Sequence, residues 1–275
     1  MKSLIRWSAT LSLVGATLAG SLFAGALEVL ALTQDQILQK LRPVPVFTIA
    51  NSEGAPLVAS PQNGQPGGPV AGVFITQTDA QAFLDNLKTR SPDVVKNVRV
   101  VPISLAEVYR MNVANQGKNE KDKLQFTVVP SRQQVDTAQS LLKKSGEKEQ
   151  FNGTPLFVAR GGPEKGYLTI QQGDKAVIPM FFKKEELQTL IDRFKQQDPK
   201  LASTLEVQVL NLEGVLEVMR TKNDPQLDQI MLIPPRESLE FVRSTMGNQQ
   251  PQTRPGQPQA RPQTAPARSA PAPKK

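Results

Sequence analysis

The pattern of hydrophobic and polar positions repeats once along this chain. Val70–Arg110 aligns without a gap with Val177–Glu217, at a constant offset. Nine aligned positions are identical, whereas average amino-acid usage gives roughly two or three by chance. We therefore predict two copies of one unit, at residues 45–145 and 155–246. The identical pairs are Val70/Val177, Phe74/Phe181, Gln81/Gln188, Asp85/Asp192, Lys88/Lys195, Pro92/Pro199, Val100/Val207, Leu105/Leu212 and Val108/Val215.

Apolar residues three and four positions apart predict the helices of each unit. This spacing indicates a helix over 77–90 and a copy of it in the second unit, and Pro92 and Pro199 follow the two helices. Two pairs, Thr78 with Gln81 and Ser131 with Gln134, are typical of capping boxes at helix starts. A further helix is expected from residue 104 to about 111. Runs of β-branched and apolar residues predict strands at 45–49, 56–59, 70–75, 98–103 and 124–129.

Strands mixed with helices in both copies predict the fold class. We expect an α+β protein made of two pseudo-symmetric repeats of a mixed sheet with packed helices, together forming one elongated body. A short N-terminal helix within 32–44, starting near Thr33 and Gln36, should dock on this body through its apolar residues.

Residues 1–31 have the layout of a secretory signal peptide. Lys2 and Arg6 precede an apolar stretch that reaches Leu27, and small residues suit cleavage after residue 26 or after residue 31. The alternative is a retained membrane anchor, because the apolar run is just long enough to span a bilayer. No later segment has this length of apolar sequence, so the mature protein is expected to be soluble.

The last segment, 247–275, is predicted to be a disordered tail. It contains seven prolines, five basic residues and no acidic residue, and it has too little apolar surface to fold. A solubilising tail is the simplest interpretation. The alternatives are a ligand built on Pro255 and Pro258, and a basic segment that attracts anionic lipid, cell-wall polymer or an acidic partner.

The amino-acid composition limits the kinds of catalytic and metal-binding site that this chain can form. The chain contains no cysteine and no histidine, so it has no disulfide, thiol nucleophile, Ser-His-Asp triad or Cys-based zinc site. We expect no catalytic residue, metal or cofactor. The net charge of +8 comes almost entirely from seven basic residues in 1–26 and 247–275, so the body is nearly neutral and nucleic acid is not an expected partner.

Two strands, VAGVFI at 70–75 and VIPMFF at 177–182, are apolar on both faces. One interpretation is a central strand that is covered on both sides. The other is that one face lines an apolar surface for an extended client segment. The candidate client-binding residues are Val73, Ile75, Met180 and Phe182.

Five segments carry a resemblance to a known family: FNGTPLFVAR (151–160), VIPMFF (177–182), VQVLNLEGVLEVM (207–219), VVPISLAEVY (100–109) and IPPRESLEF (233–241). They resemble the Tic22 (Tic twenty-two) family, the soluble intermembrane-space subunit of the chloroplast inner-envelope translocon and its cyanobacterial relatives. The resemblance covers about residues 32–246. It implies a chaperone-like protein, without nucleotide or metal, that contacts transported clients and an Omp85-type outer-membrane protein.

With a secretory signal, the resemblance points to the cyanobacterial branch and to export into the periplasm, with the thylakoid lumen as the alternative. The leading hypothesis is therefore a periplasmic accessory factor for protein translocation and outer-membrane biogenesis, and peripheral membrane association would be compatible with it. Two other classes stay open: an enzyme that uses serine, lysine and carboxylates, and a structural envelope protein that binds the cell wall through its tail.

Overall fold

The computed structural model describes residues 11–13, 31–60, 67–119 and 123–247. The predicted tail beyond residue 247 and most of the predicted leader lie outside these ranges. Strand β1 (Leu11–Leu13) falls within the predicted leader and pairs antiparallel with β8. Helix α1 (Gln34–Leu41) begins at Thr33, whose side chain and that of Gln36 form a reciprocal capping box.

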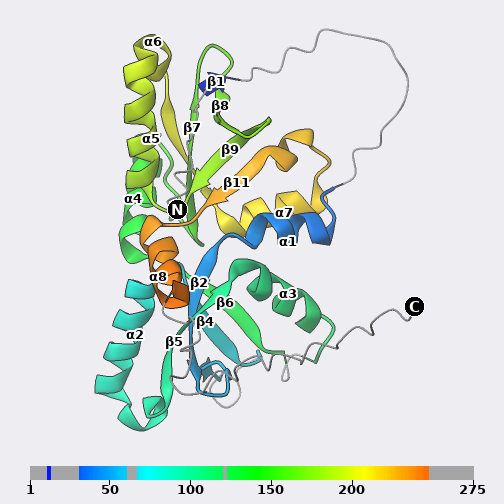
Figure 1. Ribbon diagram of the computed structural model, residues 1–275, viewed down its shortest axis with the longest axis vertical. Helices are drawn as coiled ribbons and strands as arrows, with labels where there is room; N and C mark the ends of the chain where they lie inside the picture. Colours follow the sequence, from blue (N-terminus) through cyan, green and yellow to red (C-terminus); the bar gives the residue numbers. More distant parts are fainter. Residues whose placement is uncertain (1–10, 14–30, 61–66, 120–122, 248–275) are drawn as a thin grey trace, which may run out of the picture.

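The strands and the long helices of the two predicted repeats follow in the same order (Figure 1), while the second repeat has a short α-helix in place of η1 and an additional 3-10 helix, η3. The first repeat runs β2 (Pro45–Asn51), β3 (Val58–Ala59), β4 (Val70–Phe74), α2 (Gln77–Arg90), the 3-10 helix η1 (Pro92–Val95), β5 (Val98–Ser104), α3 (Leu105–Asn115), β6 (Gln125–Val129) and α4 (Arg132–Lys144). The second runs β7 (Pro155–Gly161), β8 (Gly166–Gln172), β9 (Lys175–Phe181), α5 (Lys184–Gln197), α6 (Pro199–Ala202), β10 (Glu206–Asn211), α7 (Leu212–Thr221), the 3-10 helix η3 (Pro225–Gln229), β11 (Ile230–Ile233) and α8 (Arg236–Gly247).

Strand pairing is also duplicated. The first strand of each repeat pairs antiparallel with the fourth, β2 with β5 and β7 with β10. The third strand pairs parallel with the last, β4 with β6 and β9 with β11. Even the register agrees, because Phe47 faces Phe74 in one sheet and Phe157 faces Phe181 in the other. The predicted α+β class with two pseudo-symmetric mixed sheets is confirmed.

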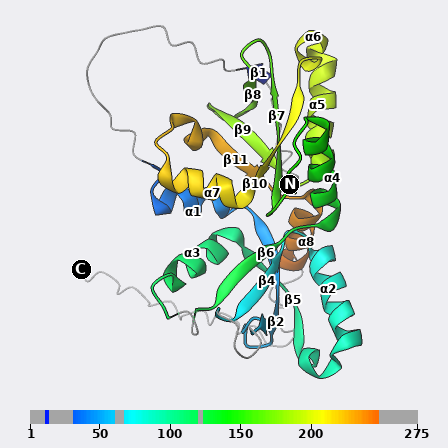
Figure 2. The same cartoon turned by 180° about the vertical axis from the view of Figure 1, so that it is seen from behind.

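The last helix of each repeat packs on the sheet of the other repeat. Helix α4 contacts β7 and β10, and its Ala138 is fully buried in a cluster with Phe157. Helix α8 contacts β2, where the ring of Phe241 stands edge-on to Phe47 at 5.5 Å between centroids. Figures 1 and 2 show α2, α4, α5 and α8 along one side of the two sheets and α1, α3 and α7 along the other. The exchange ties the repeats into one elongated body.

The largest hydrophobic cluster lies between the repeats rather than within one of them. It joins Val46 and Val73 of the first sheet to Val158 and Met180 of the second, together with buried residues of α1, α3 and α7. Burying apolar side chains of both sheets in one cluster stabilises the pair against separation. Two smaller clusters lie on the opposite faces, one beneath α2 and α8 and one beneath α4 and α5.

Helix α1 is docked in this central cluster. Ile37 and Leu41 are buried there, and the amide of Leu32 donates to the carbonyl of Met219 at 3.1 Å. The Nζ of Lys40 donates to the carbonyl oxygens of Asp228 at 2.6 Å and Ile230 at 3.3 Å. Burial lowers the pKa of Lys40, and the nearby Asp228 carboxylate opposes that shift. The predicted N-terminal helix is therefore an integral part of the body.

Candidate functional site

A cleft of about 650 Å³ opens beside α7 in the second repeat. Its walls come from strands β8, β9, β10 and β11, helix α7, the η3 segment, and the end of α4 with the linker that follows it. The residues that line the cleft are Leu142, Glu147, Glu149, Gln150, Phe151, Asn152, Tyr167, Ile178, Met180, Val209, Leu210, Asn211, Gly214, Val215, Val218, Asp224, Gln226, Leu227 and Ile230.

The floor of the cleft is apolar. Ile178, Met180 and Ile230 are almost completely buried members of the central hydrophobic cluster. At the mouth, Val218 of α7 keeps 40% of its surface exposed, which is unusual for a large hydrophobic residue in this protein. A concave apolar surface with an exposed apolar residue at its mouth is suited to binding an apolar side chain from another molecule.

One wall is the linker between α4 and β7, and side chains of two helices hold it in place. From α4, the Oε1 of Gln139 accepts from the amide of Phe151 at 2.7 Å, and its Nε2 donates to the carbonyl of Glu149 at 3.2 Å. From α7, the carboxylate of Glu213 accepts from the amide and the hydroxyl of Thr154, at 3.0 and 2.9 Å.

Gly153 allows the linker to pass this close to Glu213. Its φ is +95°, in the left-handed region, and a Cβ there would lie 2.5 Å from a Glu213 oxygen. The linker wall therefore has a defined position that depends on glycine.

The charged residues that line the cleft are all acidic. Glu147 and Glu149 lie on the linker and are exposed, and Asp224 lies at the start of η3. The carboxylate of Asp224 accepts from the amide of Gln226 at 2.9 Å, so this residue also caps the short helix. The mouth of the cleft thus combines apolar surface with negative charge.

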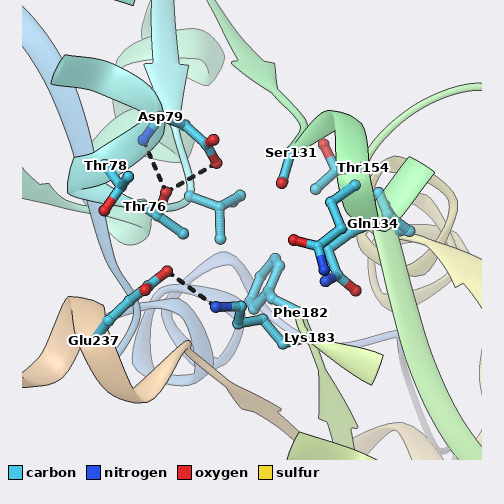
Figure 3. A pocket seen from close by; sticks show the side chains of 12 residues that line it. Thr76, Thr78, Asp79, Ser131, Gln134, Thr154, Phe182, Lys183 and Glu237 are labelled. Carbon is cyan, nitrogen blue, oxygen red and sulfur yellow. Dashed lines mark hydrogen bonds and ion pairs between the residues drawn. The ribbon is translucent and has the colours of Figure 1, made fainter. Parts of the chain in front are cut away.

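A second pocket, of about 170 Å³, lies where the two repeats meet (Figure 3). The N-terminal ends of helices from both repeats meet around it, and its carboxylates already have partners. Asp79 accepts from the Thr76 hydroxyl at 2.8 Å, and Glu237 accepts from the Nζ of Lys183 at 3.2 Å. Within the described residues, no buried side-chain nitrogen or oxygen lacks a hydrogen-bond partner. The polar groups of the second pocket therefore bind one another where the two repeats meet.

Gln134 and Ser238 occupy corresponding positions in α4 and α8, and both bind across the junction. Gln134 accepts from the amide of Lys184 at 3.0 Å and donates to Glu185 at 2.9 Å, both at the start of α5. The hydroxyl of Ser238 donates to the carbonyl of Ile75 at 2.9 Å, at the end of β4. Each exchanged helix is therefore anchored to the other repeat by a polar contact as well as by apolar packing.

The four predicted client-binding residues lie in the core. The exposed fraction is 0% for Val73, 4% for Ile75, 3% for Met180 and 2% for Phe182. They do not form an open surface, because the helices packed on both faces of the two sheets cover them, as the alternative interpretation of these strands expected. Met180 reaches the floor of the cleft, and Ile75 and Phe182 reach the wall of the junction pocket. A role in client binding stays a prediction for them.

Residues at the mouth of the cleft were missed in the sequence. For Val218, the sequence pattern did contain one indication of an exposed apolar side chain. This residue lies off the apolar stripe formed by Leu212, Val215 and Met219 of α7, so an apolar residue there faces outward. Glu147 and Glu149 carried no signal, since a polar linker between two repeats is the ordinary expectation.

The described part of the chain contains neither a cluster of potential metal ligands nor a membrane-spanning helix. Over residues 31–60, 67–119 and 123–247, no three acidic side chains gather closely enough to hold a metal ion. Among the helices of the same ranges, none combines the length and the apolar character required to cross a bilayer.

Comparison with known proteins identifies relatives over nearly the whole chain. The model of the Tic22-like family matches residues 2–244. The TIC 22-like chloroplastic protein of Arabidopsis thaliana is 28% identical over 210 residues, which cover 74% of this chain and 62% of the relative. The chloroplastic TIC 22 of Pisum sativum is 23% identical over 205 residues, 74% of each chain. This chain therefore spans somewhat less than two thirds of the Arabidopsis relative.

Two solved structures share the fold. Anabaena Tic22, described as a protein-transport protein, superimposes with a TM-score of 0.67 at 31% identity and covers 78% of this chain and 97% of its own. Tic22 from Plasmodium falciparum superimposes with a TM-score of 0.61 at 18% identity, over 78% of this chain and 99% of its own. At that lower identity the likeness concerns the fold alone.

Proposed function

This chain belongs to the Tic22-like family, which is implicated in protein transport, and we propose that it acts in the periplasm as a chaperone-like accessory factor in protein translocation and outer-membrane biogenesis. The family resemblance predicted from the sequence is confirmed, and the match to Anabaena Tic22 agrees with the cyanobacterial branch. The client proteins, the Omp85-type partner and the compartment are parts of the proposal.

The observation that carries the proposal is the cleft beside α7. Its apolar floor is preformed, and Val218 places further apolar surface at the mouth. An unfolded client exposes apolar side chains that gain free energy when they leave water, by about 25 cal/mol for each Å² buried. The cleft would bind such side chains reversibly and keep them from aggregating. This mechanism requires no catalytic group, cofactor or bound metal.

The proposed outer-membrane partner is an Omp85-type barrel. Support for it comes from the family resemblance, and support for the periplasm comes from the signal-peptide layout of residues 1–31; the thylakoid lumen would be consistent with the same layout. The near-neutral body gives no reason to expect a nucleic-acid partner.

The first experiment tests the cleft with two matched valines. Val218→Asp places a charge at the mouth, and Val94→Asp makes the same change on η1 of the first repeat, where the valine is 57% exposed. Both variants should keep the wild-type stability within about 0.5 kcal/mol, because both side chains are already exposed. The measurement is light scattering by a urea-unfolded outer-membrane barrel protein diluted into each variant.

We expect Val94→Asp to suppress aggregation like the wild type, and Val218→Asp to require about tenfold more protein for the same suppression, since client binding would have to desolvate the new charge. Equal suppression by the two variants would remove the cleft from the proposal. Absence of suppression by the wild-type protein would reject the chaperone-like role.

A second experiment tests the partner. The full chain, cross-linked in intact cell envelope and then purified, should carry an Omp85-type protein with it. If the same preparation recovers clients but no barrel-assembly protein, the proposed partner is wrong while client binding stands.

A further inference from the structure

The charged residues that line the cleft all carry the same sign of charge. The net charge of the sequence is +8, yet the three charged residues that line the cleft, Glu147, Glu149 and Asp224, are all negative. They come from two separate segments, the linker after α4 and the start of η3. The body of the protein is nearly neutral, and Lys148 and Lys222 of the same two segments are not among the residues that line the cleft, so the charged residues that line it are all negative.

These carboxylates are placed to meet a ligand. All three residues are exposed, and within the described ranges no lysine or arginine forms an ion pair with any of them. The linker that carries Glu149 is held by Gln139, so Glu149 lies on a wall of defined position, and Asp224 is fixed by its cap of η3. By contrast, the exposed Asp93 of the first repeat is paired with Lys96 at 2.8 Å.

Resting on the proposed client binding, we propose that the cleft selects segments of protein in which apolar side chains are flanked by lysine or arginine. The apolar side chains occupy the floor beside Met180 and contact Val218 at the mouth, and the basic side chains lie against Glu147, Glu149 and Asp224. Complementary charge at a partly exposed rim contributes selectivity and association rate more than affinity. Segments flanked by aspartate or glutamate are disfavoured by repulsion from the same three carboxylates.

The test uses two fluorescent peptides with the same apolar centre, one with lysines at both ends and one with glutamates at both ends. Binding to the full mature chain is measured by fluorescence anisotropy at low and at high salt. Wild-type protein should bind the lysine-flanked peptide about tenfold more tightly at low salt, because three exposed charge contacts each contribute a modest factor. The difference should shrink at high salt, since salt screens exposed charges.

Two triple variants remove the same charge from different places. The cleft variant is Glu147→Gln, Glu149→Gln and Asp224→Asn, in which asparagine preserves the cap of η3. The control variant, Glu53→Gln, Asp85→Asn and Asp93→Asn, changes three exposed carboxylates of the first repeat. The preference for the lysine-flanked peptide should fall to within about twofold in the cleft variant and persist in the control.

The outcomes separate the two proposals. If the wild type binds both peptides equally, or the two triple variants behave alike, the charge preference is wrong while the apolar cleft stands. If the wild type binds neither peptide, or Val218→Asp leaves the binding of both unchanged, the cleft is not the client site and both proposals fail.

Discussion

Helices α3 and α7 are counterparts in the two repeats, yet they are attached to their sheets by different chemistry. In α3, the side-chain amide of Asn112 accepts from the backbone N–H of Phe126 and donates to its carbonyl, both at 2.8 Å. Asn115 donates to the carbonyl of Leu124 at 2.8 Å. At the position that aligns with Asn112, α7 has Met219, which is completely buried in the central cluster.

The contrast continues at the preceding residue. Met111 of α3 packs against the central cluster, whereas its counterpart Val218 of α7 is 40% exposed at the mouth of the cleft. Both helices bury apolar residues in the central cluster, and α3 is in addition tied to the neighbouring strand β6 by side-chain hydrogen bonds. At the aligned position α7 has an apolar contact instead, and the cleft lies beside this helix. In the second copy of the fold, α7 therefore borders a cleft with an apolar floor.

The largest expected loss of stability comes from substitutions that test whether the central strands of both repeats belong to the core. Ile75→Asp and Phe182→Asp place a carboxylate at two corresponding buried positions. Each should destabilise the protein by about 4 kcal/mol or more, because an unpaired charge would lose its water. Circular dichroism during heating should show loss of the cooperative transition in both. A folded Phe182→Asp protein that had lost client binding would instead make this residue part of a binding surface.

The next effect tests the apolar attachment of α7. Met219→Asn introduces at α7 the residue type that α3 uses, but in an apolar site. We expect a loss of about 3 kcal/mol in the free energy of unfolding, since the amide would be buried among apolar side chains. The control Met219→Leu keeps the apolar volume and should cost less than about 1.5 kcal/mol. Urea titration distinguishes the two, and similar midpoints would contradict this account of α7.

A smaller effect tests the polar attachment of α3. Asn112→Leu removes both hydrogen bonds to Phe126 and should cost about 2 kcal/mol. Asn86→Leu, on the exposed side of α2, is the matched change and should fall within about 0.5 kcal/mol of the wild type. Hydrogen exchange of the Phe126 amide should accelerate only in the first variant. Unchanged protection there would show that apolar packing alone holds α3.

The smallest effect concerns the linker between α4 and β7, which forms one wall of the cleft. Gln139→Ala removes the contacts to Glu149 and Phe151 and should lower the free energy of unfolding by about 1 kcal/mol. The lysine-flanked peptide should bind several-fold more weakly, because the wall with Glu147 and Glu149 loses its fixed position. Wild-type affinity in this variant would indicate that the linker does not shape the cleft.

Local sequence patterns predicted the position of many helices and strands, but some of the predicted capping residues were wrong. The helix expected at 77–90 is α2, and Thr33 with Gln36 caps α1. The capping box predicted for Thr78 and Gln81 is wrong, because Thr76 accepts from the amide of Asp79 and is the residue that caps the helix.

The prediction for Ser131 and Gln134 failed for a different reason. Ser131 makes no side-chain cap, and Gln134 binds Lys184 and Glu185 of the other repeat instead. The spacing of a capping box is a local pattern, so it cannot reveal a partner that lies far away in the chain.

The sequence alone was sufficient for the duplication, the order of the elements and the apolar faces, because side-chain periodicity is a property of each segment and recurs at a constant offset in the second repeat. It could not say which sheet each apolar face meets. Only the tertiary structure decided that α4 and α8 are exchanged between the repeats, that Val73 and Phe182 are covered, and that Val218 remains open. Burial depends on which helix or sheet from elsewhere in the chain packs on an apolar face. Side-chain periodicity predicts the apolar face of a segment but not the element that covers it.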